Sequence, residues 1–191
     1  MTPMPPSPHH IRATAEAYLS RHPGERQLFD PLFAALAGTQ DPAHRKTFPA
    51  HVTSSAIVLD ATDRVLHIHH NATGKILAPG GHPELDDQDL VHTALRELSE
   101  EAGLPSTAVA PLPGYETVPL DIDVHGIGAN PAKGEPAHQH IDFRFVFRLT
   151  AQHTVTLQPE EVSGYHWRPL GEAASPTVRA KLALLPRPAR P

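Results

Sequence analysis

The chain has 191 residues, of which 39% are hydrophobic and 19% charged, a balance typical of one soluble globular domain with some loosely structured segments. Its formal net charge of −5 and the lack of a basic run argue against a nucleic acid polymer or an anionic membrane surface as a partner, but not against a small anionic ligand. The absence of cysteine excludes disulfides, thiolate catalysis and cysteine-bound metals.

The two ends of the chain are rich in proline and predict no compact structure. Residues 1–8 and 186–191 are therefore expected to be disordered tails. The first residues lack the charged start and apolar stretch of a signal peptide, and no apolar run approaches the roughly 18 residues of a membrane helix. We expect a cytoplasmic protein.

Residues 9–47 are predicted to form an N-terminal helical extension. Apolar residues recur at helical spacing in 9–22, where Pro23 and Gly24 end the pattern, and again in 25–37. Two roles are open for this extension, namely capping a site or mediating a homodimer.

Residues 48–185 are predicted to form the main domain. β-branched and alternating residues predict strands, and one long amphipathic segment predicts a helix between them. Because strands outnumber helices and do not alternate with them, we expect an α+β fold and not a parallel βαβ series. The expected strands are 51–60, 63–70, 115–124, 140–149 and 165–169, the expected helices are 87–102 and 171–185, and 126–138 is an expected loop.

The helix at 87–102 carries an unusual group of acidic residues. Glu97, Glu100 and Glu101 share one helical face, where like charges repel by a few tenths of a kcal/mol per pair. They also lie near the C-terminal end of the helix, which disfavours negative charge. A solvated acidic face is the simpler interpretation, but a bound hard cation would offset both costs. Arg96 lies one turn before Glu100 and is expected to pair with it or to brace Gly80 and Gly81.

The stretch "GGHPELDDQDLVHTALRELSEEAGL" resembles the Nudix box, G-x5-E-x7-R-E-U-x-E-E-x-G-U, where U is a bulky aliphatic residue. The resemblance covers residues 81–104, and the second half matches at every fixed position from Arg96 to Leu104. It implies a Nudix fold, with a mixed β-sheet sandwiched between helices. It also implies hydrolysis of a diphosphate linked to another moiety, with Mg²⁺ or Mn²⁺ as cofactor.

The resemblance also implies roles for individual residues. Glu97, Glu100 and Glu101 would be metal ligands, with the carbonyl of Gly81 as a further one, and Arg96 would be their structural and electrostatic partner. Metal ions would then orient the diphosphate and activate the attacking water.

The first half of the box departs from the family pattern. Counted from Gly81, the glutamate position falls on Asp87 and the following spacer is one residue too long; the other register places Gln88 there. The first-half glutamate is therefore missing. Asp87 is interpreted as a shorter substitute or as a helix cap, and Glu84 as a further metal-ligand candidate.

A second polar constellation lies in "HQHIDFRFVFRL". His138, His140, Asp142 and Arg144 alternate, so they share one face of a strand, and burying that face without partners would be costly. We expect it to line the site as a substrate-binding surface. The alternative is a hydrated strand face with an Asp142–Arg144 contact.

Further candidates come from single residues. His82 follows the glycine turn and is expected to contact substrate, and it could join the strand histidines around a second metal or a phosphate; His67, His69 and His70 are weaker candidates. Glu161, in a late loop, is the candidate general base, with Glu100 as its rival. The candidate base-stacking residues are Tyr115, Phe143 and Trp167.

The sequence thus predicts a metal-dependent hydrolase of a diphosphate bond in a small nucleoside-diphosphate-type or other phosphorylated metabolite. A catalytically weak Nudix module that binds a nucleotide for regulation is the alternative. A Nudix-fold isomerase is disfavoured because its usual cysteine is missing.

Overall fold

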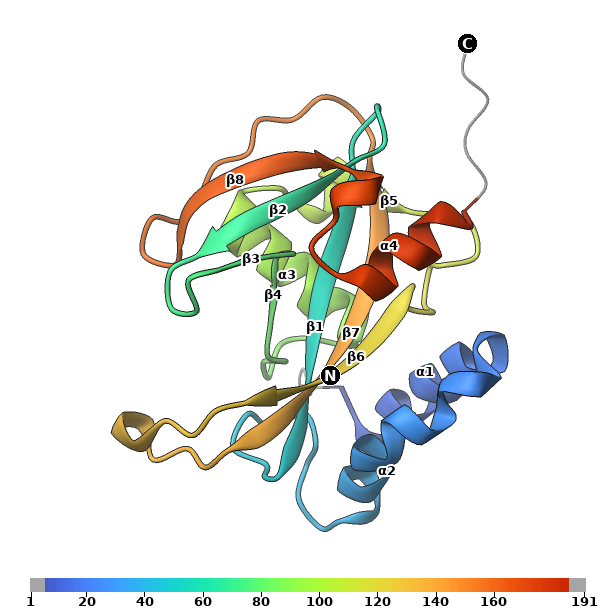
Figure 1. The fold of residues 1–191 in the computed structure, drawn as a ribbon, viewed down its shortest axis with the longest axis vertical. Coiled ribbons are helices and arrows are strands. Elements are labelled where there is room, and N and C mark those ends of the chain that lie inside the picture. Colours follow the sequence, from blue (N-terminus) through green and yellow to red (C-terminus); the bar gives the residue numbers. More distant parts are fainter. Residues whose placement is uncertain (1–5, 186–191) are drawn as a thin grey trace.

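The computed structural model describes residues 6–185, which form a mixed β-sheet with helices on both faces (Figure 1). The helices are α1 (Pro8–Arg21), α2 (Asp30–Ala37), α3 (Leu90–Ala102) and α4 (Pro176–Ala183), with 3₁₀ turns η1 (Pro23–Phe29), η2 (Ser106–Ala108), η3 (Pro131–Lys133) and η4 (Leu170–Glu172). The strands are β1 (Ala50–Leu59), β2 (Arg64–His70), β3 (Lys75–Leu77), β4 (Gly80–Gly81), β5 (Val109–Pro111), β6 (Asp121–Ile127), β7 (His138–Leu149) and β8 (Val162–Pro169).

The centre of the sheet is the parallel pair β1 and β7, which runs in register from Ala50↔Gln139 to Leu59↔Arg148. Every other strand pairs antiparallel: β2 and β4 with β1, β5 and β6 with β7, and β3 and β8 with β2. Both faces of β1 are buried throughout its length, as expected for a central strand.

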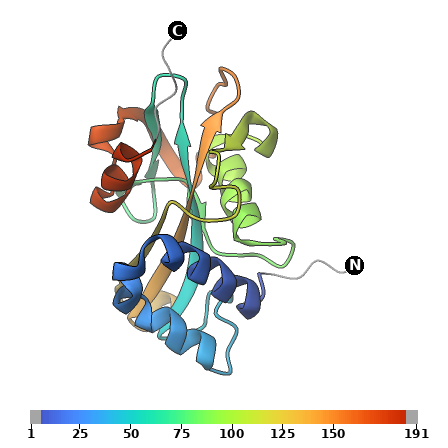
Figure 2. The ribbon, with the colours of Figure 1, turned by 90° about the vertical axis from the view of Figure 1, so that its right-hand side faces the viewer.

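Figure 2 shows α3 and α4 on opposite sides of the sheet. The odd-numbered residues of β7 face α3 and supply aromatic side chains to the larger core, whereas Val146, on the other face, packs in a smaller core that includes residues of α4. The predicted sheet sandwiched between helices, with a helical extension, is confirmed.

The N-terminal extension shares the larger core with the main domain. Ile11, Tyr18, Phe29 and Leu32 are fully buried in one cluster with residues of β1, α3 and β7. Lys181 of α4 connects the extension to the main domain, since its ammonium contacts Tyr18 and Glu25 of the extension as well as Asp121 of β6. The extension is therefore an integral layer of the structure.

Several boundaries differ from those predicted. α1 begins at Pro8 with Ser7 as its N-cap, inside the expected tail, while the other expected tail residues, 1–5 and 186–191, lie outside the described part of the chain. The segment expected to be one helix at 25–37 is a 3₁₀ turn followed by α2, which starts at Asp30-Pro31 because proline favours a first helical position.

The strand expected at 115–124 begins only at Asp121, and the short strand β5 was not predicted. The expected loop at 126–138 is shorter than predicted, because β6 extends to Ile127 and the loop contains η3 (Figure 1). Among residues 6–185, none of the helices has the length and apolar character needed to cross a bilayer.

Candidate active site

α3 is the element that positions the glutamates. Asp89 caps its N-terminus, accepting a hydrogen bond from the His92 N–H at 2.8 Å, and Gly103 ends it in the left-handed conformation at φ +64°. The predicted cap at Asp86 or Asp87 is wrong, because the helix starts at Leu90. One stripe of the helix is buried against the sheet, namely Leu90, Ala94, Leu98 and Ala102.

The backbone of β4 lies directly against two of the glutamates. The N–H of Gly80 donates a hydrogen bond to Glu101 Oε2 at 2.9 Å. A Cβ atom on Gly81 would lie 2.2 Å from Glu97 Oε1, so only glycine fits beside that carboxylate. β4 is held there by its pairing with Ser54 and Ser55 of β1. The structure thus brings Gly81, Glu97 and Glu101 together.

Arg96 links α3 to the segment that follows β4. Its guanidinium donates to Glu97 at 3.0 Å, to Glu100 at 2.9 Å and to the carbonyl of His82 at 2.8 Å. It also donates to Asp87, whose side chain is only 4% exposed. Although burial disfavours the charge, these carboxylates raise the pKa of Arg96 above its ordinary value. Both roles expected of Arg96, pairing with Glu100 and bracing the glycine turn, match these contacts.

Asp87 completes the altered first half of the box. It accepts hydrogen bonds from Arg96 and from the Glu84 N–H at 2.9 Å, so it anchors the segment between β4 and α3. Glu84 is largely exposed and lies 3.9 Å from Arg96 Nη1. Asp87 therefore acts as a partner of the arginine and not as a helix cap.

Burial makes two of the glutamates unusual acids. It raises the pKa of Glu97 to about 7 and that of Glu101 to about 8, and the repulsion between neighbouring carboxylates adds to the effect. Glu100 differs, since its side chain is 48% exposed. Carboxylates that raise one another's pKa, beside a glycine backbone that leaves room for Glu97, supply oxygen ligands of the kind that suits Mg²⁺ or Mn²⁺.

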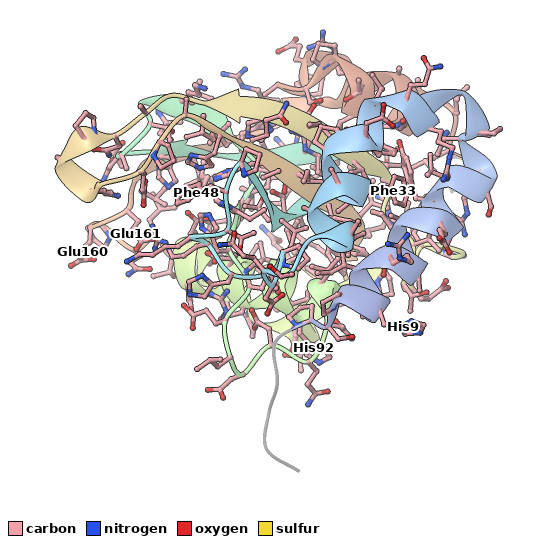
Figure 3. The ribbon with its side chains drawn as sticks, turned by 90° about the horizontal axis from the view of Figure 1, so that it is seen from below. His9, Phe33, Phe48, His92, Glu160 and Glu161 are labelled. Atoms are coloured by element: carbon pink, nitrogen blue, oxygen red, sulfur yellow. The ribbon has the colours of Figure 1, made fainter. Side chains whose placement is uncertain are left out.

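Glu161 lies in the exposed loop before β8, on the side of the molecule away from α1 (Figure 3). Its charge contributes to raising the pKa of both Glu97 and Glu101. Its backbone is fixed, because the Asn71 N–H donates to its carbonyl at 2.8 Å. The candidate base therefore lies within electrostatic reach of the buried carboxylates.

The polar face of β7 is divided into two parts. In the first, Arg144 donates to Asp142 at 2.9 Å, to Asp121 at 3.1 Å and to Asp123 at 2.9 Å, while Asp142 also accepts from Ser55. These groups satisfy one another inside the fold. The Asp142–Arg144 contact that the sequence suggested as an alternative is present, and a substrate-binding role for the pair stays a prediction.

The second part is a cluster of imidazoles, which we call the histidine cluster: His51 of β1, His82 after β4, and His138 and His140 of β7. Among residues 6–185, His51, His138 and His140 are the group whose ligand atoms all lie within 4.8 Å of one another. Burial lowers the pKa of His82 to about 3 and that of His140 to about 2. His51, His138 and His140 lie close together because β1 and β7 pair in register, placing His51 opposite His140, and the pairing of β4 with β1 brings His82 beside them.

His51 was not singled out from the sequence. Its signal was the alternation of His51, Thr53 and Ser55, which puts three polar side chains on one face of a strand that otherwise reads as apolar core. Only the pairing of β1 with β7 places that face beside the polar face of β7.

The weaker histidine candidates lie apart from this cluster. His67 is buried, with Nε2 accepting from the Ala174 N–H at 2.9 Å, and His69 packs on His166 with ring centroids 4.7 Å apart. His70 instead lies near the glutamates, with Nε2 3.9 Å from Glu101 Oε1.

The expected stacking role of Phe143 is wrong. Phe143 is fully buried because it belongs to the β7 face that packs in the larger core, so no ligand ring can reach it. Tyr115 lies under the guanidinium of Arg21 at 5.0 Å, and Trp167 is partly buried against the larger core.

The structure is thus a mixed sheet between helices, in which the carboxylate-bearing helix α3 lies against the Gly-Gly strand β4, and this is the arrangement expected of a Nudix fold. The family model described as "NUDIX domain" matches residues 49–187. The chain belongs to the Nudix family.

The chain is also similar to two curated proteins over part of its length. It is 35% identical over 101 residues to a probable DHNTP pyrophosphohydrolase of Lactococcus lactis subsp. cremoris, covering 53% of this chain and 55% of that protein. It is 40% identical over 68 residues to the uncharacterized Nudix hydrolase NudL of Yersinia pestis, covering 31% and 34%. The chain thus matches about half or less of the length of these relatives.

Solved structures share the fold at low identity. A C. elegans Ap4A hydrolase in a binary complex superposes with a TM-score of 0.51 at 14% identity, covering 69% of this chain and 92% of that one. A Nudix-family hydrolase from Clostridium perfringens gives 0.50 at 22% identity, covering 70% and 97%.

Proposed function

We propose that this chain hydrolyses a diphosphate bond in a small nucleoside-polyphosphate-type metabolite with the help of Mg²⁺ or Mn²⁺. The observation that carries the proposal is the packing of Glu97 and Glu101 against the glycine backbone of β4. Glu100 lies one helical turn after Glu97, and Arg96 donates hydrogen bonds to both. Membership of the Nudix family supports it.

Each acidic residue has a distinct role in this proposal. Glu97, Glu100, Glu101 and the carbonyl of Gly81 would hold the metal, which when bound neutralises the diphosphate and lowers the pKa of a water molecule. Arg96 keeps Glu97 and Glu100 oriented through direct hydrogen bonds. These groups orient the substrate so that its phosphorus can be attacked in line with the bond that breaks.

Glu161 is proposed as the general base. It would accept a proton from the attacking water as the new P–O bond forms and the bridging P–O bond breaks, and that proton would pass to solvent or to the departing phosphate. Its position in an exposed loop would allow it to approach a bound substrate. Glu100 is the rival for this role.

One relative suggests which substrate to test first. Because one relative is a probable DHNTP pyrophosphohydrolase, we propose dihydroneopterin triphosphate as the first substrate to test, followed by nucleoside triphosphates and dinucleoside polyphosphates. Release of phosphate or pyrophosphate would be followed with Mg²⁺ and with Mn²⁺. No turnover of any member of this panel would favour the nucleotide-binding module over the hydrolase.

The base is tested with neighbouring substitutions in one loop. Glu161→Gln should lower kcat at least tenfold and remove the acidic limb of the pH–rate profile, since that limb reports the base. Glu160→Gln, one residue away and also exposed, is the matched control and should behave as wild type. If the two variants were indistinguishable, Glu100 would become the candidate base.

A further inference from the structure

We propose that the histidine cluster, His51, His82, His138 and His140, is a binding site for a divalent transition metal such as Zn²⁺, separate from the carboxylate site on α3. Imidazole nitrogens suit zinc and its neighbours, whereas Mg²⁺ prefers oxygen ligands. The inference rests on the arrangement of these rings and does not depend on the proposed hydrolysis.

Two of the rings are oriented as metal-binding histidines usually are. His51 Nδ1 lies 2.9 Å from the carbonyl of Thr47, and His138 Nδ1 lies 2.8 Å from the carbonyl of Pro136. Since a carbonyl only accepts hydrogen bonds, each Nδ1 carries the proton and donates it. Each Nε2 therefore presents a lone pair, which is the tautomer that a backbone carbonyl fixes in metal sites.

These lone pairs point at other imidazoles. His51 Nε2 is 3.1 Å from His82 Nε2, and His138 Nε2 is 3.3 Å from His140 Nε2. Two nitrogens bound at about 2.0–2.1 Å to one tetrahedral zinc lie roughly 3.3 Å apart. The ring centroids of His51 and His140 are 4.7 Å apart and those of His82 and His140 are 5.0 Å apart, so the two pairs lie next to each other. The ligand atoms of His51, His138 and His140 lie within 4.8 Å of one another, so these three form the core of the proposed site, and His82, which contacts His51, would supply the fourth ligand.

The surroundings favour an occupant for this centre. His51 and His138 are buried, and the partner of each Nε2 lone pair is another imidazole nitrogen, from His82 and His140 respectively. The ring of Phe48 packs edge-on against His51 and His138, with ring centroids 6.0 and 5.1 Å apart. A cation shared among the imidazoles would bind these Nε2 lone pairs together.

The site would join three separate parts of the fold. His51 comes from β1, His138 and His140 from β7, and His82 from the segment that leads from the glycine turn to α3. That segment is one residue longer than in the family pattern. A metal held by His82 and the strand histidines would therefore fix this longer segment to the sheet, one residue from Gly81.

The test is Zn²⁺ binding to the full chain, stripped of metal with a chelator and titrated calorimetrically in excess Mg²⁺. We expect one tight Zn²⁺ site that Mg²⁺ does not displace, and Co²⁺ should give the visible absorption of four-coordinate nitrogen ligation. Zn²⁺ should also raise the unfolding temperature, because it binds only the folded protein. These readouts do not require activity, so they fail or succeed independently of the proposed hydrolysis.

Variants then identify the ligands. His140→Ala and His82→Ala, both at partly exposed positions, should each weaken Zn²⁺ binding at least tenfold, whereas His153→Ala, an exposed histidine outside the cluster, should bind as wild type. Glu97→Gln should keep the zinc site. Circular dichroism and His140→Gln, which retains a polar side chain of similar reach, separate ligand loss from misfolding. Wild-type affinity in either cluster variant, or loss of the site in Glu97→Gln, would overturn the proposal.

Discussion

Replacing Gly81 by alanine should lower the proposed hydrolytic activity about 100-fold without unfolding the protein. The new Cβ atom would lie 2.2 Å from Glu97 Oε1 and 2.5 Å from Glu97 Cδ, where ordinary contact begins near 3.4 Å. The carboxylate must therefore move by about 1 Å. A misplacement of that size at a catalytic centre costs about 100-fold in rate, or about 3 kcal/mol of transition-state stabilisation.

Stability should change much less than activity in this variant. The clash falls on the end of a flexible side chain, and Gly81 does not need a left-handed backbone conformation. Alanine in place of glycine changes the free energy of unfolding by at most about 1 kcal/mol when the backbone is compatible. A loss of activity together with a near-normal melting temperature is thus the expected signature.

The assay combines steady-state hydrolysis of the best panel substrate with Mn²⁺ binding followed by electron paramagnetic resonance. Both kcat and Mn²⁺ affinity should fall, because Glu97 is proposed to act on both. Gly171→Ala is the control, since nothing lies within 4 Å of its new Cβ. Gly81→Ala activity within twofold of wild type would refute the placement of Glu97 in the site.

Three further predictions concern the acidic site and the N-terminal layer. Glu100→Gln should lower turnover at least tenfold in kinetic assays, while circular dichroism should show that the fold is retained. Unchanged activity would contradict the assignment of Glu100 to the metal site. With metal removed by a chelator, the free energy of unfolding should fall as pH rises from about 4.5 towards 8. Burial raises the pKa of Glu97 to about 7 and that of Glu101 to about 8, so over this range the folded state holds protons that the unfolded state releases. Urea unfolding measures this slope, which saturating Mg²⁺ and the Glu97→Gln/Glu101→Gln variant should both flatten; an equal slope in that variant would assign it to other groups. Lys181→Met should destabilise the protein by roughly 3 kcal/mol, because it leaves the nearly inaccessible carboxylate of Asp121 without one of its cations. This value is at the lower end for breaking a buried ion pair, since Arg144 still contacts Asp121. A loss below about 1 kcal/mol in thermal unfolding would contradict the prediction.

Much of the candidate site could be predicted from the sequence because its signals are local. The 3.6-residue period places Glu97, Glu100 and Glu101 on one face of a helix, and Gly103 marks where that helix ends. The alternation from His138 to Arg144 likewise predicted one polar strand face. The helix start was misjudged because several acidic residues in a row are all acceptable caps, and tertiary pairing of Asp87 with Arg96 left Asp89 as the cap.

Other features depend on pairings between distant segments. Residue spacing alone could not show that His51 lies opposite His140, since that requires the parallel register of β1 and β7, two strands that are separated in the chain by residues 60–137. It could not show that Arg144 is enclosed by aspartates of β6, or that Phe143 faces the core. Strand identity is encoded locally, whereas strand partners are chosen by the packing of the whole sheet.

The amino-acid sequence alone was sufficient to predict the family and the three acidic residues that characterise its box, because these signals lie close together along one helix. The tertiary structure decided what surrounds them: a glycine backbone that leaves room for Glu97, an aspartate that engages Arg96, and four histidines from three segments gathered at one point. The physical reason is that helix periodicity acts over a few residues, while burial and register bring together residues that are far apart in the chain, such as His51 and His140.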